Sequence, residues 1–138
     1  MARIPESSRK ADLLVIDDQS VMRALIRDFL QTSLPDLVIA EASDGKRGMR
    51  LVAEREPRVV LMDVSLPDAN GIELTARIRE LQPAVQVIVI STFRGSAYVE
   101  RAHLAGAVGY VNKDKIYADL MPLLVRSLAA QHEIGACR

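Results

Sequence analysis

Acidic residues directly follow two short apolar runs of the sequence, and their spacing carries the clearest chemical signal. The run 59–62 ends on Asp63, and the run 13–16 ends on the pair Asp17 and Asp18. Short runs rich in Val, Ile and Leu are typical of buried strands. Open α/β sheets place their chemistry at the carboxyl ends of such strands, although one isolated acid there is more simply explained as a cap. Two such ends together indicate a site.

If these two strands are parallel neighbours, their three carboxylates meet at one edge of the sheet. Carboxylates within a few ångströms of one another raise each other's pKa or require a cation. Ligands that are all oxygen select a hard ion, and Mg²⁺ takes one or two carboxylates together with waters and a phosphate. The three aspartates therefore predict a Mg²⁺ site prepared for a phosphoryl group.

Apolar runs alternate with helical patterns along the chain. Predicted strands cover residues 12–17, 37–40, 58–63, 85–90 and 108–112. Predicted helices cover about 21–32, 44–54, the segment between Asn70 and Pro83, about 96–105, and a last helix from about residue 119. This alternation predicts one parallel sheet with helices on both faces and right-handed crossovers. All strand ends then share one rim, which collects Asp17, Asp18, Asp63, Ser91, Thr92 and Lys113.

Capping and breaking residues set the expected limits of the helices. Ser20, Asp44 and Asn70 are expected N-caps, because their side-chain oxygens can accept from the first free backbone N–H groups. Pro122 is tolerated only in the first turn of a helix, so regular helix is expected from about Asp119, after irregular chain over 114–118. The residues expected to face the core are Met22, Leu25, Ile26, Phe29 and Leu30 in the first helix, Met49, Val52 and Ala53 in the second, Leu74, Ile78 and Leu81 in the third, and Leu120, Leu123, Leu124, Ser127 and Leu128 in the last.

Composition limits the class of protein. A length of 138 residues fits one domain, expected at 12–131 between a polar tail at 1–11 and a short tail at 132–138. Basic and acidic residues balance at eighteen each, which argues against nucleic-acid binding. The N-terminus has no apolar stretch, no run approaches the ~18 residues of a spanning helix, and the single Cys137 fits a reducing compartment. A cytoplasmic protein without a membrane segment is therefore expected.

The rim residues, taken together, resemble the receiver domain of two-component response regulators, the single-domain chemotaxis type included. The resemblance covers residues 12–131, nearly the whole chain, and its pieces match in order and in spacing. They are Asp17-Asp18, Asp63 with Pro67 and Gly71, Ser91, and Gly109-Tyr110-Val111-Asn112-Lys113. The resemblance implies a flavodoxin-like (βα)5 fold, whose five-stranded parallel sheet has the order 2-1-3-4-5 and makes strands 1 and 3 neighbours.

The resemblance also implies a role for each rim residue. Asp63 would be the phosphoacceptor, supplied by a phosphohistidine of a sensor histidine kinase. Asp18, Asp63 and the backbone carbonyl of Ser65 would bind Mg²⁺ directly, and Asp17 would bind it through water. Lys113 would pair with the phosphoryl oxygens. The remaining residues of the phosphoryl site and its switch would be Ser91, Tyr110 and Thr92.

These roles are consistent with the physics of phosphoryl transfer, which asks a protein mainly for positioning and charge neutralisation. Asp63 is already ionised and needs no base, while Mg²⁺ and Lys113 neutralise the incoming charge. New phosphoryl oxygens can then capture Ser91 and Lys113, and such contacts bias a two-state element. We expect that element to be Tyr110 with the helix at 96–105, which has few apolar residues.

The implied partners are a sensor histidine kinase and an output protein or effector domain. A homodimer through helix 4, strand 5 and helix 5 is left open. The chain is expected to be no enzyme, apart from promoting its own phosphorylation and dephosphorylation, and to bind neither nucleic acid nor membrane.

Three features depart from the family pattern. Asp114 follows Lys113 at a position where the family frequently has proline. A cis peptide bond is in doubt here, because without proline it costs ~3 kcal/mol. The Lys-Asp pair is similar to that of receivers attached to LuxR-type regulators. Thr92 is bulkier than the usual alanine or glycine and would narrow access to the phosphoryl site. Only residues 131–138 follow the last helix, so a stand-alone receiver and the receiver half of a helix-turn-helix regulator are both expected possibilities.

Other functions remain as alternatives. A phosphatase of the haloacid-dehalogenase class also uses a strand-end Asp with Mg²⁺, but it needs a second acid where this chain has Ser65, and a cap domain besides. A dinucleotide-binding domain would need a glycine-rich loop after the first strand. A receiver-like interaction module that takes no phosphoryl group stays open. The residues expected to have no site role are His103 and His132 on the surface, and Asp68 and Asn70 in turns or caps.

Overall fold

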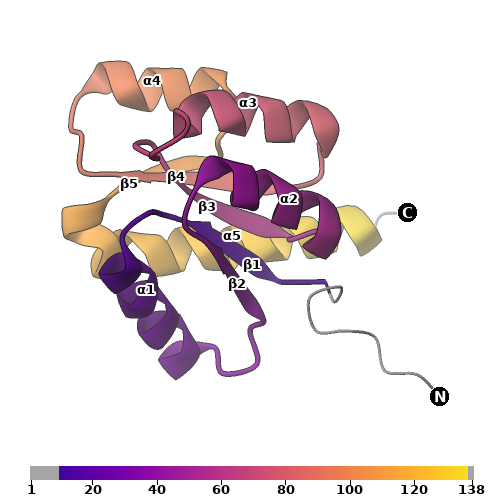
Figure 1. The fold of residues 1–138 in the computed structure, drawn as a ribbon. Coiled ribbons are helices and arrows are strands. Elements are labelled where there is room, and N and C mark those ends of the chain that lie inside the picture. Colours follow the sequence, from indigo (N-terminus) through magenta and orange to yellow (C-terminus); the bar gives the residue numbers. More distant parts are fainter. Residues whose placement is uncertain (1–9, 137–138) are drawn as a thin grey trace.

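The computed structural model describes residues 10–136, with side chains from Lys10 to Ala130 (Figure 1). Residues 1–9 of the tail predicted at 1–11, Cys137 and the side chain of His132 lie outside the described residues. The elements are β1 (Leu13–Ile16), α1 (Ser20–Ser33), β2 (Ile39–Ala42), α2 (Gly45–Arg55), β3 (Val59–Asp63), α3 (Gly71–Leu81), β4 (Gln86–Ser91), α4 (Ser96–Leu104), β5 (Gly109–Asn112), the 3₁₀ turn η2 (Lys113–Lys115) and α5 (Ile116–Ala136).

The described strands form one parallel sheet in the order β2-β1-β3-β4-β5. β1 lies between β2 and β3, with Ile16 level with Met62, and Asp63 at the end of β3 is level with Ile90 of β4. The flavodoxin-like fold and its strand order are thereby confirmed. Because all these strands run the same way, the carboxyl ends of β1, β3, β4 and β5 share one rim.

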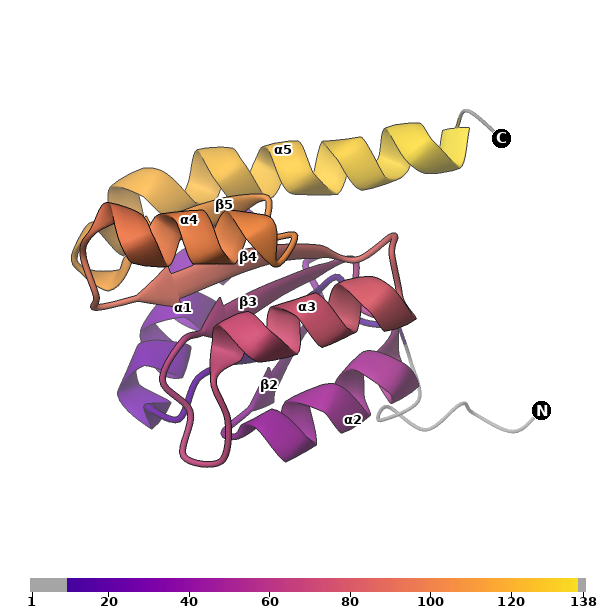
Figure 2. The same cartoon turned by 90° about the horizontal axis from the view of Figure 1, so that it is seen from above.

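Helices cover both faces of the sheet, and the strands lie between α5 and the pair α2 and α3 in Figure 2. Successive residues of β1 alternate between the two cores. Leu13 and Val15 pack with the apolar side chains of α1 and α5, whereas Leu14 and Ile16 pack with those of α2 and α3. A parallel strand covered on both faces must be apolar throughout, which is why the run 13–16 shows no polar alternation.

Two of the three expected helix caps are confirmed. The Asp44 carboxylate accepts from the backbone N–H of Arg47, and the Asn70 side chain accepts from two N–H groups in the first turn of α3. The expected Ser20 cap is wrong, because α1 begins at Ser20 and Gln19 holds the N-cap position. The Gln19 N–H is taken by the Asp17 carboxylate at 2.8 Å, so the acid pair itself sets where this helix starts.

Strand 2 and three core-facing residues differ from the sequence prediction. β2 covers Ile39–Ala42 instead of 37–40, because the Asp12 carboxylate accepts the Val38 N–H and the ladder begins only beyond it. Leu25 is 41% exposed, Leu81 is 66% exposed and Ala53 is also exposed. Each helix touches the sheet along a narrower stripe than its apolar periodicity suggests, and Leu81 ends α3 beyond that stripe.

The last helix begins earlier than predicted. α5 starts at Ile116, which is buried, and continues to Ala136, past the predicted boundary at residue 131. Pro122 therefore lies inside the helix, where it offers no N–H to the Ala118 carbonyl. Both residues are exposed, so solvent can satisfy that carbonyl. No peptide bond in the described chain is cis, so Lys113 and Asp114 are joined by a trans bond.

The least buried helix is α4, as expected from its composition, and Ala102 is its one buried residue. His103 on this helix is exposed, as predicted. Within residues 10–136, no helix has both the length and the apolar character needed to cross a membrane.

Candidate functional site

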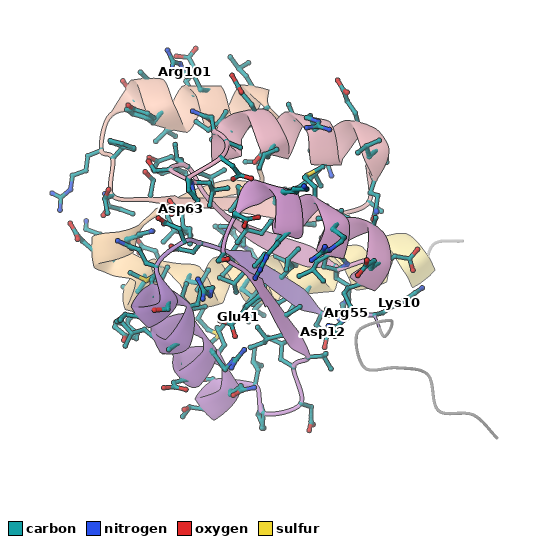
Figure 3. The ribbon with its side chains drawn as sticks, in the orientation of Figure 1. Lys10, Asp12, Glu41, Arg55, Asp63 and Arg101 are labelled. Carbon is teal, nitrogen blue, oxygen red and sulfur yellow. The ribbon has the colours of Figure 1, made fainter. Side chains whose placement is uncertain are left out.

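Three carboxylates meet at the rim where β1 and β3 end. Asp17 and Asp18 follow β1 and Asp63 closes β3, and one oxygen from each lies within 4.8 Å of the others. Asp17 and Asp63 are buried, whereas Asp18 is exposed. Figure 3 shows Asp63 at this end of the sheet, with Asp12 at the opposite end. The structure thus brings together acids from distant parts of the chain, as expected from the sequence.

The Lys113 ammonium lies among these acids. It stands 2.8 Å from Asp17 Oδ2 and 3.2 Å from Asp63 Oδ2, and the Lys113 side chain is almost wholly buried. The Gln19 Oε1 atom accepts a hydrogen bond from the same ammonium at 3.2 Å. The short turn η2 directly after β5 brings Lys113 to the rim, so its position depends on the end of β5.

Burial and mutual repulsion shift the protonation of these groups. Burial, followed by the Asp17 charge, raises the pKa of Asp63 to about 6, although Lys113 acts in the other direction. Burial alone would lower the pKa of Lys113, but the Asp17 and Asp63 carboxylates outweigh it and raise that pKa. The acids therefore hold the lysine charged, while one ammonium does not fully compensate the acids.

The donor set fits a hard divalent cation. The buried Asp17 Oδ2 has no hydrogen bond of acceptable geometry in the described chain, and its near contact is the ion pair with Lys113. The exposed Asp18 adds a third carboxylate that faces the solvent. In the turn after β3, the bonds from Gly71 N–H to Val64 O and from Leu66 N–H to Ala69 O leave the Ser65 carbonyl unused. An all-oxygen set of this kind suits Mg²⁺.

Gly71 begins α3 in direct contact with the acceptor strand. A Cβ at this position would lie 1.9 Å from the Asp63 backbone oxygen, closer than any side chain permits. The Gly71 N–H also bonds the Val64 carbonyl at 2.8 Å. The sequence analysis named this glycine only among the residues of the resemblance, and the close approach explains why glycine is required there.

The hydroxyls of Ser91, which ends β4, and of the following Thr92 make no described hydrogen bond to the acid cluster. Ser91 is buried, and its Oγ accepts the backbone N–H of Phe93 at 2.9 Å. Thr92 is exposed. The Tyr110 hydroxyl donates to the Phe93 carbonyl at 2.8 Å and makes no described contact with the acids. Phe93 in turn stacks on Tyr98 of α4, with ring centroids 4.7 Å apart.

Several residues of the site were not foreseen from the sequence. Arg23 donates to the backbone carbonyl of Asp17 at 2.6 Å and to Glu41 of β2 at 3.1 Å, which steadies the acid loop. No sequence pattern indicates this link, because it depends on β2 lying beside α1. Gln19 and Phe93 lie outside the helices and strands, and the sequence patterns gave no reason to assign either residue to the site.

Asp68 has a cap role, as expected, but it caps another element. Its carboxylate accepts the N–H groups of Gly45 and Lys46 at the start of α2, at 2.7 and 2.9 Å. These backbone bonds lower the pKa of Asp68. The turn after β3 is thereby fixed to α2, on the side of the rim away from β4.

Comparison with known proteins gives a consistent result. The family model of the response regulator receiver domain matches residues 13–124. The transcriptional regulatory protein LnrK of Bacillus subtilis is 37% identical over 102 residues, covering 74% of this chain and 46% of LnrK. The nitrate/nitrite response regulator protein NarL of Escherichia coli K12 is 30% identical over 121 residues, covering 88% of this chain and 56% of NarL.

A solved structure has the same architecture. A two-component response regulator of the LuxR family from Aurantimonas sp. SI85-9A1 superposes with a TM-score of 0.80 at 34% identity, covering 88% of this chain and 86% of the other. The chain spans about half the length of the curated relatives it matches, with 46% of LnrK and 56% of NarL covered.

Proposed function

This chain belongs to the response regulator receiver domain family, and on that premise we propose that it is a phosphorylation-dependent signalling switch of a two-component system. Asp63 accepts a phosphoryl group from a phosphohistidine of a sensor histidine kinase. The observation that carries the proposal is the Lys113 ammonium, which contacts the buried Asp17 and Asp63 carboxylates at a rim with three acids.

Asp63 acts as the nucleophile through its ionised carboxylate. Its raised pKa, about 6, still leaves most of it ionised at neutral pH, and a nearby cation increases that fraction. The Lys113 ammonium donates to Asp63 Oδ2. After transfer, the same ammonium can donate to the oxygens of the phosphoryl group on Asp63. The chain thus supplies a positioned acceptor and a fixed positive charge, which are the main requirements of phosphoryl transfer.

Mg²⁺ is the proposed cofactor. Asp18, Asp63 and the Ser65 carbonyl would hold it directly and Asp17 through water, and when bound it would neutralise charge on the transferring group. The exposure of Asp18 leaves a solvent path for the ion, whereas the burial of Asp17 keeps that acid within the protein. Asp68 and Asn70 hold the turn that carries Ser65, through the start of α2 and the start of α3.

Ser91 and Tyr110 are the proposed switch residues, and Phe93 connects them. The Ser91 hydroxyl accepts from the Phe93 N–H, and the Tyr110 hydroxyl donates to the Phe93 carbonyl. A phosphoryl group that draws the Ser91 hydroxyl toward Asp63 removes the first of these bonds. Because Phe93 also stacks on Tyr98, the change reaches α4, which has little buried surface to resist movement. Thr92, exposed beside Ser91, would narrow access to the site.

The proposed partners follow the same family logic. The sensor kinase donates, and an output protein or effector domain reads the face of α4, β5 and α5, where a homodimer could also form. Relatives named as transcriptional regulators are matched over about half their length, and both a stand-alone receiver and the receiver half of a longer helix-turn-helix regulator stay open. This part of the chain would bind neither nucleic acid nor membrane, would act in the cytoplasm, and would catalyse only its own phosphorylation and dephosphorylation.

Incubation with acetyl phosphate and Mg²⁺ tests the proposal. The intact mass should rise by one phosphoryl group in the parent protein and in Asp36→Ala, whose acid is exposed and far from the rim, but not in Asp63→Ala. Steady hydrolysis of unrelated phosphomonoesters would indicate the phosphatase instead. No labelling of the parent, with no effect of Mg²⁺ on its stability, would indicate a receiver-like module that takes no phosphoryl group.

A further inference from the structure

Gln19 occupies a fixed place beside the acids and the lysine. It holds the N-cap position of α1, and its backbone N–H donates to Asp17 Oδ1 at 2.8 Å. Its side-chain Oε1 accepts from the Lys113 ammonium at 3.2 Å. The backbone of Gln19 is therefore anchored by one site acid, while its side chain reaches the site lysine across 94 residues of sequence.

The Lys113 ammonium has three N–H donors and three oxygen neighbours. Two of these neighbours are Asp17 Oδ2 and Asp63 Oδ2, and the third is Gln19 Oε1. The assignment of the amide oxygen to this contact is required, because an ammonium donates only and the amide nitrogen cannot accept. Of these three oxygen neighbours, the amide oxygen is the one without charge.

A divalent cation and the ammonium would draw on the same group of carboxylates. A Mg²⁺ ion held by these acids would repel the ammonium and would weaken its ion pairs with Asp17 and Asp63. The Gln19 amide oxygen stays available, since a neutral amide outside the carboxylate cluster is not required by the cation. The side chain of Gln19 is exposed, so it is free to follow a small movement of the lysine.

We infer that Gln19 is a positioning residue, which keeps the Lys113 ammonium beside Asp63 while Mg²⁺ takes the carboxylates. This inference rests on the proposed function and deepens it. Gln19 acts through Lys113, so its contribution exists only when the lysine is present. The Gln19 amide oxygen is an uncharged acceptor for the ammonium, in addition to the two acids. It raises the fraction of molecules in which the lysine is in place for the incoming phosphoryl group.

The test compares Gln19→Met with the parent in the rate of labelling by acetyl phosphate at saturating Mg²⁺. Methionine keeps the length of the side chain but has no comparable acceptor, and the lost bond to a charged donor should slow labelling about fivefold. Gln19→Glu keeps an acceptor for the ammonium, so it should recover part of the rate that Gln19→Met loses. Gln31→Met places the same change at an exposed position of the same helix and should label like the parent.

The decisive comparison is made in a Lys113→Ala background. There, Gln19→Met should change the labelling rate by less than about 1.5-fold, because a role that acts through the lysine is already lost. A readout without Mg²⁺ is the free energy of unfolding in urea and EDTA, which Gln19→Met should lower in the parent and leave unchanged in Lys113→Ala. An equal slowing with and without the lysine would overturn the inference and leave Gln19 as a structural cap of α1. Parent-like labelling of Gln19→Met would also overturn it. Failure of the proposed function would look different, because the parent itself would not be labelled.

Discussion

The two ends of the central strands each carry an acid and a base in contact, and they differ in burial. At the carboxyl end, Asp17 and Lys113 approach to 2.8 Å with side chains 0% and 5% exposed. At the amino end, Asp12 and Arg58 approach to 3.5 Å with side chains 29% and 38% exposed. Figure 3 labels Asp63 and Asp12, which lie at these opposite ends of the sheet.

This difference separates a site from a surface contact. Water screens the Asp12–Arg58 pair, so its charges have little influence on each other or on an approaching ion. The buried acids at the other end cannot be relaxed by water, so their repulsion persists and the pKa of Asp63 is raised. Similar residue types thus form a half-exposed ion pair at one end and a buried acid cluster with one ammonium at the other.

The largest difference between the two ends of the sheet is expected for glycine substitutions, measured as loss of unfolding free energy. Gly71→Ala puts a Cβ 1.9 Å from the Asp63 carbonyl oxygen, and because backbone must move, we expect a loss of about 3 kcal/mol or more in unfolding free energy. Gly106→Ala, at the amino end of β5, meets only the flexible Arg79 side chain but is strained by its φ of +103°, which costs about 1–2 kcal/mol. Urea unfolding measures both, and equal losses would contradict the close approach at the acceptor strand.

The next largest effect is expected from removal of the Lys113 ammonium, which should slow labelling. Lys113→Ala should slow labelling by acetyl phosphate at least about tenfold, since a buried positive charge beside the acceptor is lost. It should leave Mg²⁺ binding intact, because the carboxylates remain and a competing ammonium is gone. Isothermal titration with Mg²⁺ and intact-mass kinetics check the two statements. Lys115→Ala changes an exposed lysine of the same turn and should behave like the parent, whereas lost Mg²⁺ binding in Lys113→Ala would contradict the assigned role.

The pH dependence of stability should expose the raised pKa of Asp63. In the folded protein this pKa is about 6 against an ordinary 3.8, so the fold favours the protonated acid. Its contribution is fully present below about pH 4 and is lost as the pH rises through about 6. The upper limit is about 3 kcal/mol, because the pKa rises from 3.8 to about 6.

The measurement is urea unfolding in EDTA between pH 4 and 7, made on the parent and on Asp63→Asn. The parent should lose stability relative to the variant across this range. Mg²⁺ should reverse the trend, because it binds the ionised acid. A difference between parent and variant that does not vary with pH would show that Asp63 has an ordinary pKa.

The smallest effect is expected at the amino end. Arg58→Ala removes the contact with Asp12 and the hydrogen bond to the Leu128 carbonyl at 2.8 Å, and should lower the unfolding free energy by about 1 kcal/mol. Its labelling rate and Mg²⁺ affinity should equal those of the parent. A change in labelling would mean that the two ends of the sheet are coupled.

Much of the fold and the outline of the site could be predicted because they depend on short-range patterns. Apolar runs such as 13–16 and 59–62 indicate strands, and the crossover rule then brings Asp17 and Asp63 to one rim without any knowledge of side-chain packing. The caps at Asp44 and Asn70 follow from local chemistry as well. Some errors concern which side of a helix faces the core, as at Leu25 and Leu81, and others concern where an element begins, as at Ser20, β2 and α5.

The sequence by itself determined that the acids and the lysine follow strands of one parallel sheet, since residue type and order carry that information. Only the tertiary structure decided that Gln19 accepts from Lys113, that Arg23 holds the Asp17 carbonyl, and that Phe93 lies between Ser91 and Tyr110. The physical reason is distance. A hydrogen bond forms only when donor and acceptor are placed correctly to within a few tenths of an ångström. Between elements far apart in the chain, that placement is set by the packing of the whole domain.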